Sequence, residues 1–117
     1  MRAVQVHRVY DDSAPDDGAR VLVDRLWPRG LSKEKAHLHE WCKTVAPSTA
    51  LRRWYGHDPE RFKEFDSRYR NELEAPERAE ALAHLRTLAA KRTLTLLTAT
   101  RAVEISAATV LARLLQT

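Results

Sequence analysis

The stretch RVLVDRLWPRG, residues 20–30, decides much of the fold of this chain. Its first part, Arg20 to Asp24, is a short valine-rich run that ends in a carboxylate, a pattern typical of a buried β-strand. The second part must leave regular structure, because Pro28 has no N–H to donate to a strand ladder and Gly30 permits unusual backbone angles. We therefore expect a strand followed by an irregular loop.

Further elements are predicted outward from this stretch in both directions. Strands are expected at residues 4–9 and 93–98, and helices are expected at 33–36, 49–55, from 59 to before 76, from 76 onward, and at 105–115. Ser32, Ser48 and Asp58 are the predicted N-caps of the first three helices. Residues 37–46 permit either a strand or a helix, and the acidic residues 11–17 predict a solvated loop that ends in a turn at Gly18.

This order of elements predicts an α/β fold. Long connections between strands favour parallel pairing, so we expect a small, mainly parallel sheet of about three or four strands flanked by helices. A length of 117 residues suits a single domain spanning residues 1–117. Ligands of such sheets bind beyond the carboxyl ends of the strands, which indicates residues 24–29 and the loop after Thr98.

Composition excludes several classes of protein. The single cysteine, Cys42, rules out an intrachain disulfide. No apolar run approaches the roughly 20 residues of a membrane span, and the first residues lack the apolar core of a signal peptide. We therefore expect a cytoplasmic protein without a membrane partner, and we leave its oligomeric state open.

Positive charge gathers in one part of the chain. The net charge is +4, whereas residues 18–63 alone hold ten Lys/Arg against five Asp/Glu. Such a balance favours anionic partners such as phosphates, nucleotides or nucleic acid. A solvated surface that keeps the protein in solution is the alternative explanation.

The densest group of functional residue types lies in residues 24–30. Arg25 and Arg29 offer planar, bidentate recognition of phosphate or carboxylate, and Asp24 can accept a proton or orient an arginine. Trp27 is a further candidate ligand contact. The alternative is structural: Asp24 pairs with Arg25 or Arg29 to brace the loop, and Trp27 belongs to the core.

A second group of candidates follows along the chain. Lys35, Arg52 and Arg53 add cations, and Trp54 adds an aromatic ring that could stack on a nucleic-acid base or belong to the core. Ser48 adds a hydroxyl that also suits a helix cap, and His57 is a candidate acid or base together with Asp24. For His57 we favour a local role, in which it packs in a turn beside the cap Asp58.

No metal or cofactor is predicted. His37, His39 and Cys42 have no paired ligand spacing and no defined fourth ligand for zinc. The sequence also lacks a Walker loop, a G-x-G-x-x-G motif, an H-E-x-x-H motif and a G-x-S-x-G motif.

Residues 20–34 resemble the signature of the domain-of-unknown-function 488 family, in its short YeaO-like branch. The resemblance covers nearly the whole chain and implies a compact α/β fold, a bacterial-type cytoplasmic protein and a site at the motif residues. Further residues that carry it are 8–10, Trp41, Lys43, 46–48, 51–52, Trp54, 56–59, Phe65, Tyr69 and 72–73.

The chain departs from the family pattern after its last predicted strand. Relatives carry an acidic residue and an Asn/His pair there, whereas this chain has Ala102 at the acidic position and Ile105, Ser106 and Ala107 at the others. If those polar groups complete a catalytic site in relatives, this chain has lost the activity or changed its ligand.

Three functions follow as hypotheses. The first is a pocket for a small, phosphate-bearing anion held by Arg25, Arg29 and Arg52 and oriented by Asp24. The second is a hydrolase or transferase that uses Asp24 and His57 as acid and base. The third is a nucleic-acid-binding module. We favour it least, because the surplus of positive charge is modest and no known nucleic-acid motif is present.

Overall fold

The computed structural model describes residues 3–116. Within that range the strands form one fully parallel sheet in the order β1-β4-β2-β3. The strands are β1 (Val4–Arg8), β2 (Ala19–Leu22), β3 (Glu40–Trp41) and β4 (Leu94–Thr98), and the α-helices are α1 (Lys33–Ala36), α2 (Thr49–Tyr55), α3 (Phe62–Glu72), α4 (Pro76–Lys91) and α5 (Ala107–Leu115). The expected α/β class, with a small parallel sheet flanked by helices, is confirmed.

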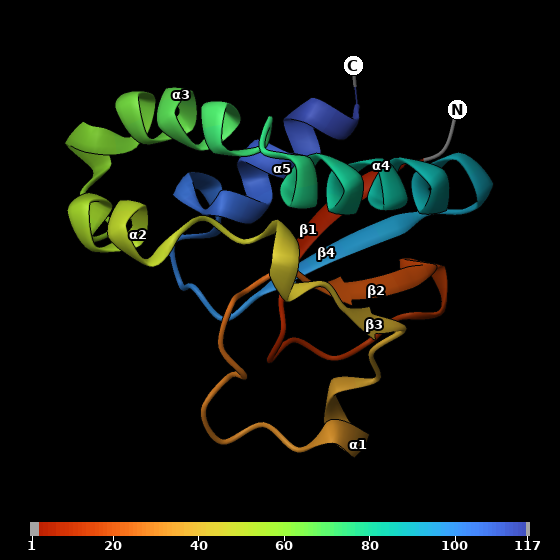
Figure 1. The fold of residues 1–117 in the computed structure, drawn as a ribbon. Helices are drawn as coiled ribbons and strands as arrows, with labels where there is room; N and C mark the ends of the chain where they lie inside the picture. Colours follow the sequence, from red (N-terminus) through yellow and green to blue (C-terminus); the bar gives the residue numbers. More distant parts are fainter. Residues whose placement is uncertain (1–2, 117) are drawn as a thin grey trace.

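The two faces of the sheet are covered differently (Figure 1). Helices α2 to α5 lie on one side, while α1 and the loop around it lie on the other. Because side chains alternate along a strand, Val21 and Leu96 join the core with the helices, whereas the neighbouring Leu22 and Leu97 pack against the loop. The central strands β2 and β4 are therefore buried on both faces, as the valine-rich run predicts.

A stack of aromatic rings fills the core under α2 and α3. The ring centroids of Tyr55 and Phe65 lie 4.1 Å apart, and those of Phe65 and Tyr69 lie 5.7 Å apart. The buried Tyr69 hydroxyl donates a hydrogen bond to the carbonyl oxygen of Val45. The aromatic residues of α3 thus form its inner face.

Local signals placed most helix ends correctly. Ser32 and Ser48 cap α1 and α2, and Gly56 ends α2 in the left-handed conformation. Asp58 caps a 3₁₀ turn, Pro59–Arg61, that leads into α3. In residues 3–116 no helix combines the length and the apolar character required to cross a membrane.

Two segments differ from the prediction in detail. Residues 37–46, which permitted a strand or a helix, divide into the short β3 and a 3₁₀ turn, Lys43–Val45. The last helix begins at Ala107 rather than at residue 105, because the Ser106 hydroxyl accepts a hydrogen bond from the Thr109 N–H and so caps the helix there.

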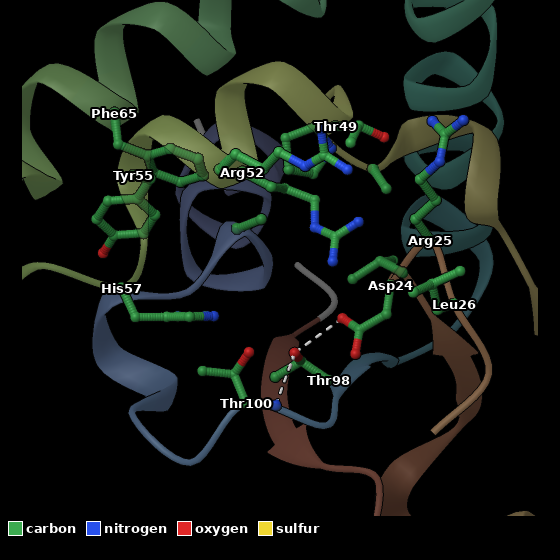
Figure 2. Close-up of a pocket in the computed structure, with 15 residues that line it drawn as sticks. Asp24, Arg25, Leu26, Thr49, Arg52, Tyr55, His57, Phe65, Thr98 and Thr100 are labelled. Carbon is green, nitrogen blue, oxygen red and sulfur yellow. Dashed lines mark hydrogen bonds between the residues drawn. The ribbon is translucent and has the colours of Figure 1, made fainter. Parts of the chain in front are cut away.

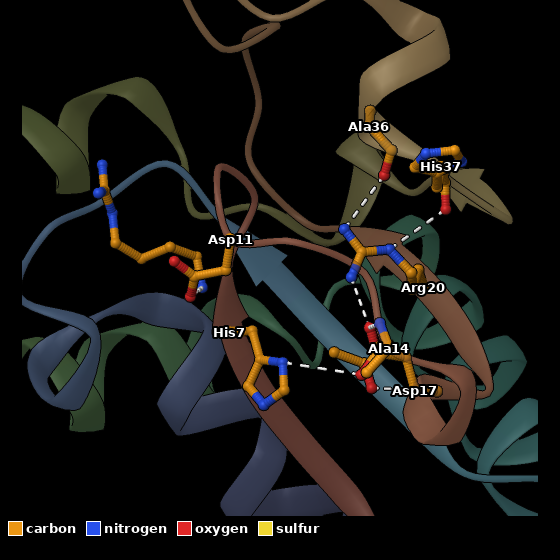
Figure 3. A network of polar contacts seen from close by, with 9 residues as sticks. His7, Asp11, Ala14, Asp17, Arg20, Ala36 and His37 are labelled. Atoms are coloured by element: carbon orange, nitrogen blue, oxygen red, sulfur yellow. Dashed lines mark hydrogen bonds and ion pairs between the residues drawn. The ribbon is translucent and has the colours of Figure 1, made fainter.

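The prediction that residues 11–17 form a solvated loop is wrong for Asp17. Its side chain is only 3% exposed and pairs with Arg20 of β2, with 2.6 Å between Oδ2 and the guanidinium. Figure 3 shows that the same guanidinium also donates to the carbonyl oxygens of Ala36 and His37. One arginine therefore joins the loop before β2 to the end of α1 after it.

The predicted turn at Gly18 explains how Asp17 becomes buried. Gly18 has φ +64°, and a Cβ on it would lie 2.1 Å from the carbonyl oxygen of Thr93. Only glycine therefore allows the loop to approach β4 so closely. At this approach the Thr95 hydroxyl donates to the Asp17 carbonyl oxygen, 2.7 Å away.

The electrostatic balance at Asp17 favours its ionised form. Burial raises its pKa, but the hydrogen bond from the Ala14 N–H and the pairing with Arg20 outweigh that effect, and the pKa lies below its ordinary value. The pair therefore stabilises the fold above the ordinary aspartate range, and this contribution is lost as the pH falls through the lowered pKa.

Replacing the carboxylate should destabilise the protein. We expect Asp17→Asn to lower the free energy of unfolding at neutral pH by about 3 kcal/mol, because Arg20 stays buried without its counter-charge. Urea denaturation measures the loss. The matched control is Asp16→Asn, an exposed neighbour in the same 3₁₀ turn, which should change stability by less than about 0.5 kcal/mol. Equal effects of the two variants would contradict this role for the ion pair.

Candidate functional site

A pocket of about 490 Å³ opens at the carboxyl ends of the central strands (Figure 2). The segments after β2 and β4 form its floor, and α2 with the residues before and after it forms its walls. This is the location that the strand-end rule predicts for a parallel sheet. The lining residues are Val23, Asp24, Arg25, Leu26, Ala46, Pro47, Thr49, Arg52, Arg53, Tyr55, His57, Phe65, Thr98, Thr100 and Ala107.

Asp24 is the carboxylate of the pocket. Because β2 and β4 are parallel neighbours, the segment after β2 reaches the end of β4, where Oδ1 accepts from the Thr98 hydroxyl and Oδ2 from the Ala99 N–H, both at 2.8 Å. The alternative in which Asp24 pairs with Arg25 or Arg29 is thus wrong in its partner. Asp24 joins the end of β2 to the end of β4 and does not pair with an arginine of its own loop.

The environment of Asp24 favours its protonated form. Burial raises the pKa of this carboxyl above its ordinary value and prevails over the hydrogen bonds from Ala99 and Thr98 and the nearby Arg52 and His57, all of which lower it. Asp24 is thus the opposite of Asp17, in which hydrogen bonds and an ion pair prevail over burial.

Three arginines line the same pocket as this carboxyl group. Arg25 comes from the loop after β2, and Arg52 and Arg53 come from the last turn of α2. All three are exposed, and no side chain within residues 3–116 forms an ion pair or a hydrogen bond with their guanidinium groups. The pocket therefore holds three cations against one carboxylate, before His57 is counted.

His57 enters the pocket from the turn after α2. Its backbone is in the left-handed region at φ +57°, and its ring centroid lies 5.8 Å from that of Tyr55. The neighbouring Asp58 accepts from the Glu60 N–H as a cap, as the local interpretation expects. His57 nevertheless faces the same pocket as Asp24 (Figure 2).

Three predicted contacts lie outside the pocket. Trp27 packs edge-on against Trp41 at 5.4 Å, on the sheet face opposite α2 to α5, and its indole N–H donates to Leu31. Arg29 is exposed in the same loop, where its carbonyl oxygen accepts from the Tyr10 hydroxyl. Lys35 is exposed on α1. The pocket therefore brings together Asp24, Arg25, Arg52 and His57 of the predicted set, without these three.

Ser48 is a structural residue beside the pocket. Its hydroxyl accepts from the Leu51 N–H as the cap of α2 and donates to Oε2 of Glu72 on α3. The Ser48 N–H donates to the other carboxylate oxygen at 2.8 Å. These bonds fix the start of α2 against α3, so Ser48 acts on the pocket through the position of the helix.

Other lining residues were not among the predicted ligand contacts. Arg53 had been grouped with Lys35 and Arg52 as a further cation, without a contact assigned to it. Thr98 and Thr100 follow β4, where only the loop as a whole was indicated. Within residues 3–116 no group of three His, Cys, Asp or Glu side chains could hold a metal ion.

A family model matches almost the entire chain. The model describes the inactive DUF488-N3 subclade and covers residues 3–117. The chain belongs to this family. The resemblance drawn from residues 20–34 is therefore confirmed, while no solved structure matches the chain.

Three relatives of this DUF488-N3 chain are described as uncharacterized proteins. A protein of Mycobacterium tuberculosis (strain ATCC 25618 / H37Rv) is 55% identical over 112 residues, which is 96% of this chain and 92% of the relative. A protein of Mycobacterium bovis (strain ATCC BAA-935 / AF2122/97) has the same identity and coverage. The protein YeaO of Escherichia coli (strain K12) is 42% identical over 94 residues, 80% of each chain.

The residues that depart from the family pattern lie at or near the pocket. Ala107, the first residue of α5, lines it, and Ser106 caps that helix. The carbonyl oxygen of Ile105 accepts from the Tyr55 hydroxyl at 2.7 Å. Relatives are expected to carry polar side chains at these positions. This chain instead has the methyl group of Ala107 in the pocket, while Ser106 and Ile105 form hydrogen bonds that hold the local structure.

The raised pKa of Asp24 predicts a pH dependence of stability. A folded pKa above the unfolded one adds stability at low pH that is lost as the pH rises through the folded value. As the pH falls from neutral, the wild type should therefore gain unfolding free energy relative to Asp24→Asn, which cannot titrate. Urea unfolding of both proteins across this pH range measures the difference. The assignment would be contradicted if the unfolding free energy of the wild type minus that of Asp24→Asn stayed constant or fell toward acidic pH.

Proposed function

We propose that this protein binds a small, phosphate-bearing anion in the pocket at the ends of β2 and β4. The proposal rests on one observation: Arg25, Arg52 and Arg53 line a single pocket and have no ion-pair partner among residues 3–116. A guanidinium offers paired N–H donors that match the oxygens of a phosphate group.

Two exposed arginines of α3 provide a contrast. On α3, Arg68 pairs with Glu64 and Arg70 pairs with Asp66, each one helical turn away. Their charges are thus balanced within the helix itself. The arginines at the end of α2 have no acidic residue one turn before them, so the positive potential in the pocket is available to a ligand.

Asp24 sets a requirement on the anion. Its two oxygens accept hydrogen bonds from Thr98 and Ala99, and neither oxygen is used to pair with an arginine. An ionised carboxylate on the pocket floor repels an anion, whereas the protonated form does not. Because burial raises the pKa of Asp24, binding should strengthen as the pH falls toward that raised value.

The family favours binding over turnover. Its model describes an inactive subclade, and in this chain alanine replaces a polar group expected at the pocket wall, at Ala107. A hydrolase or transferase is the second candidate, since Asp24 and His57 line the same pocket as that mechanism requires. Release of phosphate or product from a panel of phosphate esters, abolished in Asp24→Asn, would favour the enzyme.

Arg52 of α2 provides the direct test. With inorganic phosphate and a panel of nucleotides and sugar phosphates, we expect anions to raise the melting temperature of the wild type. Arg52→Gln should weaken the best binder about tenfold in Kd, the typical cost of losing one charged hydrogen-bonding partner. Thermal-shift titration followed by calorimetry measures both quantities.

The matched control removes the same charge elsewhere. Arg92, the exposed residue after α4, lies at the end of β4 opposite the pocket, so Arg92→Gln should leave the affinity unchanged. Equal weakening in both variants would indicate general electrostatics and contradict the pocket. Retention on oligonucleotides that falls steeply with salt, without response to small anions, would favour the nucleic-acid-binding alternative.

A further inference from the structure

A second pocket adjoins the first and shares part of its wall. It has a volume of about 380 Å³ and is lined by Arg25, Leu26, Lys43, Thr44, Glu77 and Arg78. Arg25 and Leu26 line both pockets, so this pair of exposed side chains borders both cavities. Figure 2 shows that Arg25 extends away from the Asp24 carboxyl group.

The second pocket is also rich in positive charge. Arg78 of α4 is half-buried and oriented by a hydrogen bond from its Nε to the carbonyl oxygen of Ala46, a residue of the first pocket. No hydrogen bond or ion pair within residues 3–116 occupies its two terminal nitrogens. Its donors are thus held in place and remain available.

Lys43 is the other cation of this pocket. It is exposed, and its Nζ lies 5.0 Å from the centroid of the Trp41 ring, which places the ammonium group without neutralising it. The only carboxylate that lines this pocket is Glu77, in the first turn of α4, where the helix dipole already favours a negative charge. Taken together, the two pockets present five Lys or Arg side chains and two carboxylates.

The wall between the pockets indicates what kind of ligand could span them. Leu26 is 65% exposed, and it and Tyr10 are the exposed large apolar side chains of residues 3–116. A ligand body that crosses the wall would cover this side chain and remove apolar surface from water. Charged groups at both ends and a less polar body between them would therefore match the whole surface.

We propose that the ligand carries two phosphate groups, one bound by Arg52 and Arg53 in the first pocket and the other by Lys43 and Arg78 in the second, with Arg25 between them. This inference rests on the proposed function, because the first phosphate is the anion proposed above. The chemical class is a small bisphosphate, such as a sugar or nucleoside bisphosphate. A single phosphate would use only half of the cationic surface.

The test compares ligands with one and two anionic ends on the full chain. The probes are alkane bisphosphonates of increasing chain length, each beside the monophosphonate of the same length, and calorimetry gives Kd at constant ionic strength. We expect at least one bisphosphonate to bind about tenfold or more tightly than its monophosphonate, because it makes a second charged contact. No advantage at any chain length would overturn the proposal.

Two variants assign the ends of the ligand. Lys43→Gln should abolish the advantage of the bisphosphonate and leave the monophosphonate affinity unchanged, whereas Arg52→Gln should weaken both. Failure of every phosphonate to bind would contradict the proposed function itself. Normal monophosphonate binding with no effect of Lys43→Gln on the bisphosphonate would overturn the second subsite alone. Circular dichroism of each variant checks that it is folded.

Sugar and nucleoside bisphosphates are then compared with the alkane bisphosphonate that binds best. They are chosen so that their two phosphate groups are separated by about the length of that probe. Tighter binding of either class than of the alkane probe supports the proposal and identifies the body of the ligand. An affinity that rises continuously with the length of an oligonucleotide would instead indicate a polymer, and would overturn the assignment to a small molecule.

Discussion

The buried ion pair between Asp17 and Arg20 is the interaction on which the arrangement around β2 depends. Arg20 lies in the middle of a strand that is buried on both faces, where an unpaired guanidinium would be very costly. Asp17 supplies the counter-charge, and the carbonyl oxygens of Ala36 and His37 use the remaining donors. The charge can therefore be buried only when the preceding loop and the end of α1 are both in place, which fixes the chain on either side of β2.

The order of strands then creates the site. With β4 between β1 and β2 and all strands parallel, the segments after β2 and β4 must leave the sheet side by side. The hydrogen bonds from Thr98 and Ala99 to Asp24 hold these two segments together. The connection from β3 to β4 runs through α2, whose last turn delivers Arg52 and Arg53 to the same place. The pocket thus follows from topology, and its charge follows from the residues that happen to end each element.

Features set by neighbouring residues could be predicted from the sequence, and features set by distant ones could not. Strands β1, β2 and β4 and the serine caps depend on local backbone preferences, and they were placed correctly. The burial of Asp17 depends on Gly18 approaching Thr93, some 75 residues further along the chain, and so the acidic loop looked solvated.

The same distinction explains the candidate site. Arg25 directly follows a predicted strand, so it could be anticipated near the strand ends, whereas Arg52 was indicated only by its charge. Trp27 and Arg29 are almost as close in sequence, but the loop after Leu26 turns to the opposite face of the sheet, where Trp27 packs over Leu22 and Leu97. No periodic pattern marks such a change of side. Proximity along the chain therefore indicated the edge of the sheet at which these residues lie. It did not indicate that Trp27 lies on the face opposite the pocket.

Asp24 reconciles the structural and the ligand-binding demands on this edge. Bracing β2 against β4 requires an oxygen acceptor, while an anion in the pocket binds more favourably when the carboxyl group is neutral. The partners of Asp24 allow both, because a hydroxyl can donate or accept: the protonated carboxyl can donate to the Thr98 oxygen while its other oxygen still accepts from the Ala99 N–H. The brace can thus persist through a change of protonation, so the pocket can accommodate negative charge without separating the strand ends that form it.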